Sequence, residues 1–286
     1  MKVSVDSLRR NRKIIVFTVL IVSALGFIYY RTIAALIAVW NTDPDYSHGY
    51  VIPVVSLYMI WYIRERLSFA SLQPLNGGLF VLILGVLLQV VGFVGSEHFL
   101  QGLSLIVIFF GISLYIGGWI ITRALCVPIG FLIFMIPLPS VIWNKFTFFL
   151  KLQSSDMAVT LLKTFSSIPL IQNGNIIVLT GGSLEVADAC SGIRSLISLT
   201  AVAVLIAFIG HYALWKKYVL VFAAIPIAFV ANVTRVILMV VYANHYGIGA
   251  IESFVHPMSG AMIFIVGFAL LYGLNAIFSH DTKKIS

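Results

Sequence analysis

The chain has 286 residues, of which 60% are hydrophobic and only 10% are charged, whereas soluble domains have about 45–50% apolar and about 25% charged residues. A soluble fold of this length could not bury so much apolar surface, so the composition excludes a soluble globular protein. The formal net charge of +8 does not indicate nucleic-acid binding, because the basic residues gather between apolar segments, where they orient membrane proteins.

Long apolar segments follow one another along the chain, and a helix needs about 20 such residues to cross a hydrocarbon core. The sequence therefore predicts an all-α polytopic membrane protein of about eight transmembrane helices, with residues 1–286 forming a single domain. The predicted spans are residues 14–40, 47–63, 77–95, 99–121, 124–139, 195–210, 218–243 and 258–278. The membrane bundle would occupy residues 14–278, and residues 140–190 would form an extracytoplasmic insertion.

Lys and Arg precede the first span and recur in every second connection, which predicts that both termini are cytoplasmic. On that side lie 12 of the 18 basic residues: Lys2, Arg9, Arg10, Arg12, Lys13, Arg64, Arg66, Arg123, Lys216, Lys217, Lys283 and Lys284. The even number of spans agrees, so we expect a multi-pass protein of the inner (plasma) membrane. The first span is too long for a cleaved signal peptide and is expected to be retained.

The insertion has two parts. Residues 141–165 alternate apolar and polar side chains, which predicts a helix at the membrane interface that either covers the bundle or guides substrate. Residues 176–180 and 183–186 are β-rich runs on either side of a Gly-Gly pair, which predicts a small outer β-hairpin. The hairpin would lead the chain directly to Cys190.

Cys190 falls at the outer end of the predicted span 195–210. Asp188 or Ser191 would cap the first turn of that helix, and the helix dipole would favour the thiolate form of Cys190. Cys126 would lie at the opposite membrane face, which excludes a disulfide between the two cysteines. Cys190 is therefore either a small packing residue or a nucleophile.

Two arginines near this site have competing interpretations. Arg194 would pair with Asp188 or Glu185, or polarise the thiol. Arg235 lies inside the span 218–243, where a charged side chain costs about 2.5–3.5 kcal/mol on insertion scales. Asn232 shares its helix face, so the two would form a polar stripe inside the bundle, unless Arg235 extends to the lipid headgroups.

Four histidines, His48, His98, His245 and His256, fall near the outer ends of spans, and any of them could act as an acid or base near neutral pH. Their spacing matches no zinc pattern, and no Gly-rich phosphate loop follows a strand. We therefore expect neither a metal nor a cofactor.

Four motifs together resemble the exosortase and archaeosortase family of membrane sorting enzymes, and in particular its bacterial exosortase branch. They are a loop motif, DPDYSHGY, at 43–50; a cysteine motif, ACSGIRS, at 189–195; an arginine motif, NVTR, at 232–235; and a histidine motif, HPMSG, at 256–260.

The resemblance implies a membrane-embedded cysteine protease and transpeptidase that acts through a thioester. Its catalytic residues would be Cys190, Arg235 and His256, and we expect Arg194, Asn232 and His48 to support them. Its substrates would be secreted proteins that end in a Pro-Glu-Pro-like (PEP-CTERM-like) motif, a transmembrane helix and a basic tail. Membrane lipids would surround it, and no nucleic acid would bind.

Two other functions remain open. A multipass transporter would use Arg235 and Asn232 to bind an anionic solute between helices. A lipid acyltransferase would form its thioester on Cys190. The sequence shows no paired inverted halves, which disfavours the transporter.

Overall fold

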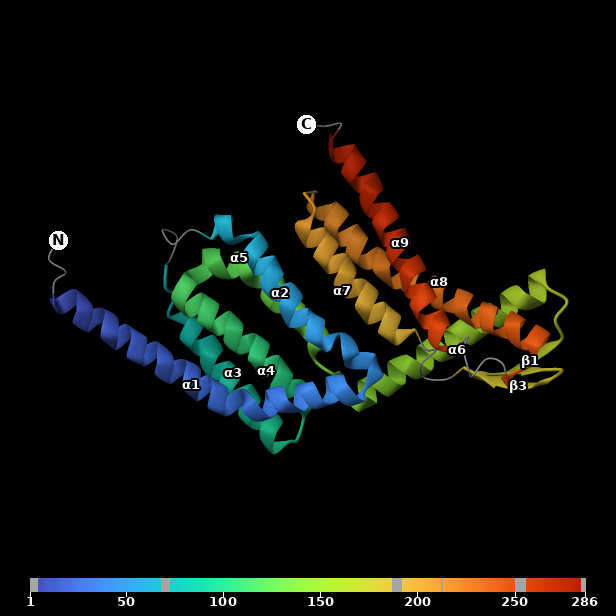
Figure 1. The fold of residues 1–286 in the computed structure, drawn as a ribbon, viewed down its shortest axis with the longest axis horizontal. Helices are drawn as coiled ribbons and strands as arrows, with labels where there is room; N and C mark the ends of the chain where they lie inside the picture. The colour runs from blue at the N-terminus through green and yellow to red at the C-terminus, as the bar shows by residue number, and fades with distance from the viewer. Residues whose placement is uncertain (1–4, 68–72, 187–191, 212, 250–255, 284–286) are drawn as a thin grey trace.

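A computed structural model describes residues 5–67, 73–186, 192–211, 213–249 and 256–283; within these ranges it describes only the backbone of residues 5–22, 66, 256–258 and 280–283. Helices dominate the fold (Figure 1). The helices are α1 (Val5–Thr42), α2 (Val51–Tyr62), α3 (Gly77–Val94), α4 (His98–Ile112), α5 (Gly118–Phe131), α6 (Ser140–Phe165), α7 (Ile193–Ile209), α8 (Leu214–Tyr246) and α9 (His256–Lys283). Shorter elements join them: the 3-10 helices η1 (Pro44–Tyr50), η2 (Arg64–Arg66) and η5 (Leu132–Met135), and the π-helical segment η4 (Ser113–Gly117).

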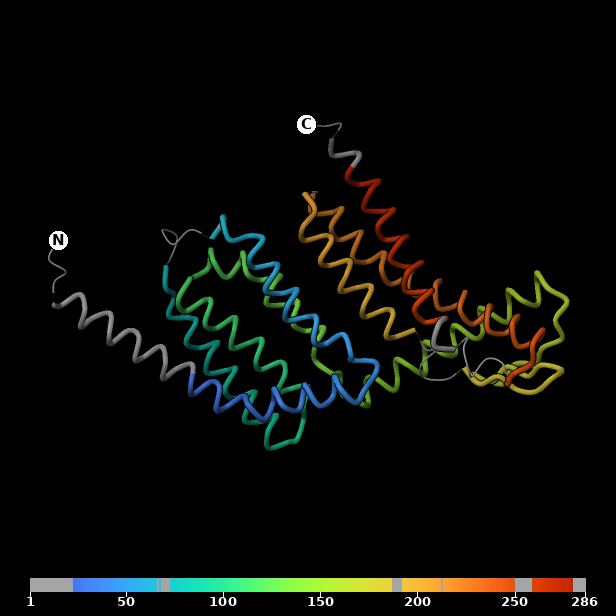
Figure 2. The backbone as a smooth tube through the Cα atoms, in the orientation of Figure 1, coloured from blue at the N-terminus to red at the C-terminus, as the bar shows by residue number. Residues whose placement is uncertain are grey.

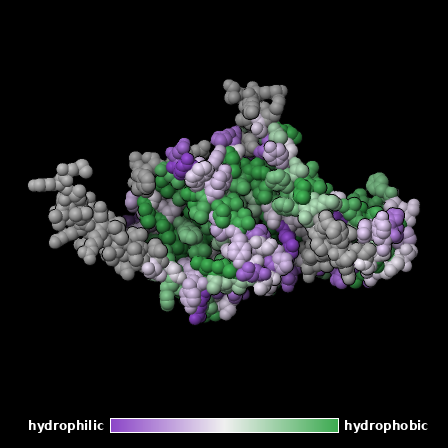
Figure 3. Space-filling view, viewed as in Figure 1, coloured by the Kyte–Doolittle hydropathy of each residue, from purple (hydrophilic) through white to green (hydrophobic). Residues whose placement is uncertain are grey.

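Among the described residues, five helical stretches are long and apolar enough to cross a membrane: Ser23–Thr42, Gly77–Val94, His98–Met135, Leu214–Tyr246 and Ser259–Ser279. The third has 38 residues and contains both α4 and α5, while α7 is a shorter apolar helix. The face in Figure 3 shows an apolar band over these helices between more hydrophilic margins. The predicted all-α polytopic membrane fold is confirmed.

The predicted boundary between the spans 99–121 and 124–139 is wrong. The chain turns at η4 and Gly118 instead, so Arg123 lies inside α5 rather than in a connection. Gly118 has a φ of +72°, and a Cβ there would lie 1.9 Å from the carbonyl oxygen of Gln73. Only glycine fits this turn, because it alone combines that conformation with so close a backbone contact.

The glycines Gly78, Gly85 and Gly92 recur every seventh residue along the buried face of α3. A Cβ on any of them would lie within 3 Å of α4 or η4 atoms. Large apolar side chains of α3 face outward instead, and Phe80 is 72% exposed. Small residues inside and large ones outside are typical of helix packing in lipid.

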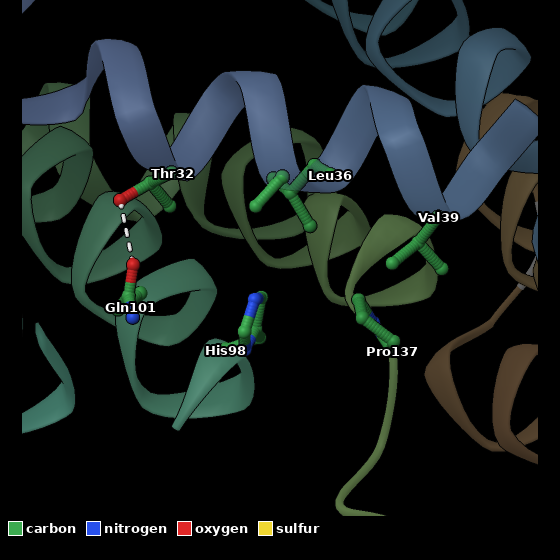
Figure 4. A pocket seen from close by; sticks show the side chains of 7 residues that line it. Thr32, Leu36, Val39, His98, Gln101 and Pro137 are labelled. Atoms are coloured by element: carbon green, nitrogen blue, oxygen red, sulfur yellow. Dashed lines mark hydrogen bonds between the residues drawn. The ribbon is translucent and has the colours of Figure 1, made fainter. Parts of the chain in front are cut away.

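A hydrogen-bonded polar cluster ties α1 to α3 and α4. Gln89 donates to the Thr32 hydroxyl at 2.8 Å. Thr32 in turn donates to Gln101 at 3.2 Å, the bond drawn in Figure 4. Ser104 donates to Gln89 at 2.9 Å and bonds the Tyr29 hydroxyl at 3.1 Å. Because unpaired polar groups are costly in an apolar interior, this cluster fixes the register of the three helices.

A small antiparallel sheet packs beside α6 and the end of α8, with strands β1 (Leu170–Asn173), β2 (Ile176–Leu179) and β3 (Gly182–Glu185) in that order. The predicted hairpin is confirmed as β2 and β3. The sequence pattern missed β1, which pairs with β2 through a tight turn at Gly174, where φ is +62°. Helix α6 confirms the helix predicted at 141–165.

The C-terminal end of α9 and the start of α7 lie on opposite sides of the helix bundle (Figure 2). In Figure 2, α9 ends on the side of the bundle away from η1 and from the start of α7. Contacts of α2 and α5 with α7 join the N-terminal helices to the unit of α7, α8 and α9.

Candidate functional site

The six predicted site residues lie on three helices, the η1 turn and one segment outside the described residues. Arg235 and Asn232 lie in α8, Arg194 in the first turn of α7, and His48 in η1. Cys190 falls outside the described residues. His256 is the first residue of α9, and its side chain is not among those described.

Arg235 is buried, with only 6% of its surface exposed. Its Nε donates a hydrogen bond of 2.9 Å to the Ser259 hydroxyl of α9. The same guanidinium lies over Gly260, where an added Cβ would be 3.7 Å from Nη2. The alternative in which Arg235 extends to lipid headgroups is therefore wrong, because the side chain points into the bundle at the histidine motif.

Asn232 joins three segments at one point. It is 3% exposed, and its Nδ2 donates a 3.0 Å hydrogen bond to the Ser154 hydroxyl of α6. Gly192 lies against the same side chain, since a Cβ there would be 2.7 Å from Asn232 Cγ. The cysteine motif thus contacts the arginine motif one helical turn from Arg235.

Helix α7 begins at Ile193, two residues before the predicted span 195–210. Gly192, with a φ of +80°, occupies the N-cap and has no side chain with which to cap the helix. The predicted caps, Asp188 and Ser191, lie outside the described residues. Because α7 begins at Ile193, Cys190 precedes the first helical turn instead of belonging to it.

Arg194 connects the cysteine motif to the loop motif. Its Nε and Nη2 donate to Asp45 Oδ1 at 2.8 and 2.6 Å. The predicted pairing with Glu185 is wrong, since Glu185 accepts from Asn175 at 3.3 Å instead. With side chains 46% and 18% exposed, the Arg194–Asp45 pair is a partly buried ion pair.

The loop motif folds into η1 through its own side chains. Asp43 caps the turn by accepting from the Asp45 N–H at 2.8 Å, and Pro44 begins it. The buried Tyr46 hydroxyl accepts from the Leu138 N–H at 2.9 Å, so η1 is fixed to the segment before α6. This anchoring sets where Asp45 meets Arg194.

Burial favours the neutral form of the His48 imidazole. Burial lowers the pKa of His48 below its ordinary 6.5, and the charge of Arg194 lowers it further, although hydrogen bonds to the carbonyls of Phe134 and Asp45 act in the opposite direction. The 3.1 Å bond from Nε2 to the Phe134 carbonyl requires Nε2 to carry the proton. His48 therefore anchors η1 against η5.

The other two histidines considered as an acid or base, His98 and His245, lie away from Arg235. His98 lines a pocket between α1 and α4 with Leu36 and Pro137 (Figure 4). His245 is exposed in the last turn of α8, ten residues and about 15 Å along the helix from Arg235. Within the described ranges, no group of three or more His, Cys, Asp or Glu could hold a metal ion.

Sequence reasoning missed Ser154, Ser259 and Asp45 as partners of the predicted residues. Asp45 and Ser259 fall inside the loop and histidine motifs, so the motifs themselves were a signal that could have found them. Ser154 has no such signal, because nothing near it in sequence sets it apart from other serines of α6.

Comparison with known proteins identifies the family of this chain. A family model described as transmembrane exosortase matches residues 40–273, a range that contains all four motifs. Neither the curated proteins nor the solved structures gave a match.

Proposed function

This chain belongs to the transmembrane exosortase family, and from that premise we propose that it is a membrane-embedded cysteine protease and transpeptidase. It cleaves C-terminal sorting signals of the PEP-CTERM type from secreted proteins. The substrate's own transmembrane helix lies beside the enzyme and brings the cleavage point to its outer end.

One observation carries this proposal: the arginine motif contacts both the cysteine motif and the histidine motif. Gly192 of the cysteine motif lies on Asn232, and Arg235 of the arginine motif donates to Ser259 of the histidine motif. A transporter would use Arg235 and Asn232 to bind its solute. It would have no use for the contact between the cysteine motif and Asn232.

In the first step the Cys190 thiolate attacks the scissile carbonyl, and a C–S bond forms while the carbonyl oxygen gains negative charge. Arg235 stabilises that charge in a poorly hydrated setting. His256, as imidazolium, gives its proton to the departing amine as the C–N bond breaks. The membrane anchor and basic tail leave, and a thioester remains on Cys190.

In the second step an acceptor amine or water attacks the thioester, and His256 takes the proton of that nucleophile. The C–S bond breaks and the Cys190 thiolate returns. Arg194, Asn232 and His48 do not touch the reacting atoms in this scheme; they hold the start of α7 and the loop motif in place.

The active site faces outward and both termini are cytoplasmic in this proposal. The support is the distribution of Lys and Arg, together with the end of α9, which lies on the side of the bundle away from η1 (Figure 2).

Neutral hydroxylamine, which cleaves thioesters, tests the covalent step. Enzyme trapped with a tagged substrate should carry a hydroxylamine-sensitive adduct at Cys190, and Cys190→Ala should leave the substrate at full length. His256→Ala should slow both steps, whereas His245→Ala should retain near-normal turnover. A Cys190→Ala enzyme that still processes substrate, with no adduct on the wild type, would overturn the proposal.

A further inference from the structure

Strand β3 is an edge strand of the sheet, and the chain continues from it to the proposed nucleophile. It is the last strand in the order β1-β2-β3, so one of its edges pairs with β2 and the other faces away from the sheet. Gly182, Ser183 and Glu185 are exposed, while Leu184 is buried in the core formed with α6 and α8.

The register identifies which backbone groups point to this edge. The Val186 N–H donates to the Asn175 carbonyl at 2.9 Å, so that opposed pair is a hydrogen-bonded one. Bonded and non-bonded pairs alternate along an antiparallel ladder, which makes Leu184, opposite Ile177, bonded to β2. The N–H and C=O groups of Ser183 and Glu185 therefore point away from β2, toward the open edge.

The chain continues from β3 into residues 187–191, which include Cys190. Cys190 comes five positions after Glu185, and five extended residues span at most about 18 Å. The next described residue, Gly192, lies against Asn232. The chain therefore leaves the C-terminal end of β3 for the cysteine motif, which contacts the arginine motif through Gly192.

We infer that β3 receives the substrate segment that precedes the scissile bond, and that this segment adds to the sheet as a fourth strand. The inference rests on the proposed function. A protease must hold its substrate extended, and pairing with a strand edge does so through main-chain hydrogen bonds that tolerate many side chains.

The direction of the added strand follows from the chain order. The secreted part of the substrate precedes the cut, and Cys190 lies beyond the C-terminal end of β3. The segment therefore runs parallel to β3, toward Cys190.

The opposite edge of the sheet, strand β1, does not lead a bound substrate strand toward Cys190. Strand β1 follows α6 rather than leading to Cys190, and its Gln172 donates to Asp156 of α6 and to the Gly174 carbonyl. This edge supplies a matched control.

The pairing has one distinctive consequence. Only every second N–H of an added strand faces β3, so the substrate should depend on alternate amides. An amide-to-ester scan removes one N–H at a time with little change of shape. We therefore design the scan over the eight positions before the scissile bond of a synthetic sorting-signal peptide that includes its transmembrane helix.

With purified full-length enzyme in lipid nanodiscs, esters at alternate positions should lower kcat/KM about 2- to 10-fold each, and those between them should change it little. A flat profile with normal cleavage overturns the inference and leaves the proposed function standing. An all-amide peptide that is neither cleaved nor found as a thioester on Cys190 removes the proposed function, and this inference with it.

Enzyme variants test the same edge from the other side. Ser183→Pro removes an N–H that makes no bond to β2, and it should lower kcat/KM more than Ser183→Ala, which keeps that N–H. Gln172→Pro should cost no more than Gln172→Ala, because β1 receives no substrate. The thermal midpoint of each variant in detergent separates lost pairing from lost folding. Equal losses for Ser183→Pro and Ser183→Ala at unchanged midpoints, or a Ser183→Cys enzyme that cross-links to a second copy through β3 in the presence of substrate, would contradict the inference.

Discussion

At the scale of single residues, the contacts of Arg235 depend on the shape of its guanidinium group as well as on its charge. The Nε bond to Ser259 holds the guanidinium plane over Gly260, and a lysine has no Nε–H in that place. These contacts depend on the planar guanidinium group and not only on its positive charge.

We predict that Arg235→Lys lowers kcat about 10²- to 10³-fold, the usual cost of removing one donor to a developing oxyanion. Membrane insertion should be normal, because the charge is unchanged. Substrate processing and the amount of membrane-extracted enzyme would be measured together. Near-normal turnover by Arg235→Ala would remove Arg235 from the mechanism.

His48 predicts a pH dependence of stability. Its pKa is lowered by burial, so below pH 6.5 the unfolded chain binds a proton that the folded protein takes up only at lower pH. Stability should therefore fall as pH decreases from 6.5 toward the folded pKa, and level off below it. Thermal midpoints in detergent between pH 8 and pH 5 measure this. His48→Gln, which keeps a donor for the Phe134 carbonyl, should flatten the curve, whereas a curve identical to wild type would refute the assignment; exposed His245→Gln is the control.

At the scale of elements, the start of α7 depends on Gly192. Its φ of +80° is costly for other residues, and a Cβ would lie 2.7 Å from Asn232. At Gly192 the cysteine motif, the start of α7 and Asn232 meet. A small displacement of the start of α7 would therefore move the segment that carries Cys190.

We predict that Gly192→Ala destabilises the protein by at least about 1 kcal/mol and strongly lowers turnover. Gly181→Ala, at a turn position where an added Cβ meets nothing within 4 Å, is the matched control and should stay near wild type in both assays. Thermal midpoint and processing rate would be compared for the pair. Wild-type behaviour of Gly192→Ala would mean that the contact with Asn232 does not position the site.

At the scale of the whole molecule, the two cysteines report the orientation. Cys126 is exposed inside α5, eight residues after its first residue Gly118, rather than at the predicted cytoplasmic end of the span. The cysteine motif joins the sheet to the start of α7. If the termini are cytoplasmic, as proposed, we expect only the second of these regions to meet the outer solution.

We predict that a membrane-impermeant maleimide applied to intact cells or spheroplasts labels Cys190 and spares Cys126. The reason is that a charged reagent reaches only thiols at the outer surface. Mass spectrometry of the extracted enzyme identifies the labelled cysteine. Labelling of Cys126 alone would reverse the proposed orientation, and Cys190→Ala provides the unlabelled reference.

The sequence by itself determined the fold class, because apolar length and composition follow from the physics of the bilayer without knowledge of any contact. It also identified Arg235 as anomalous and the β2–β3 hairpin from its Gly-Gly turn. It missed β1 and misplaced the turn before α5, since a strand of four residues and a break at Gly118 leave little trace in hydropathy.

Only the tertiary structure decided which polar groups meet. Arg194 pairs with Asp45 across 149 residues, Asn232 with Ser154 across 78, and Arg235 with Ser259 across 24. Reading along the chain could offer Arg194 only near neighbours such as Glu185, nine positions before it, because the sequence does not show which distant residues meet. Partners so distant are chosen by how the helices pack, and the cost of leaving polar groups unpaired in an apolar interior then fixes the choice.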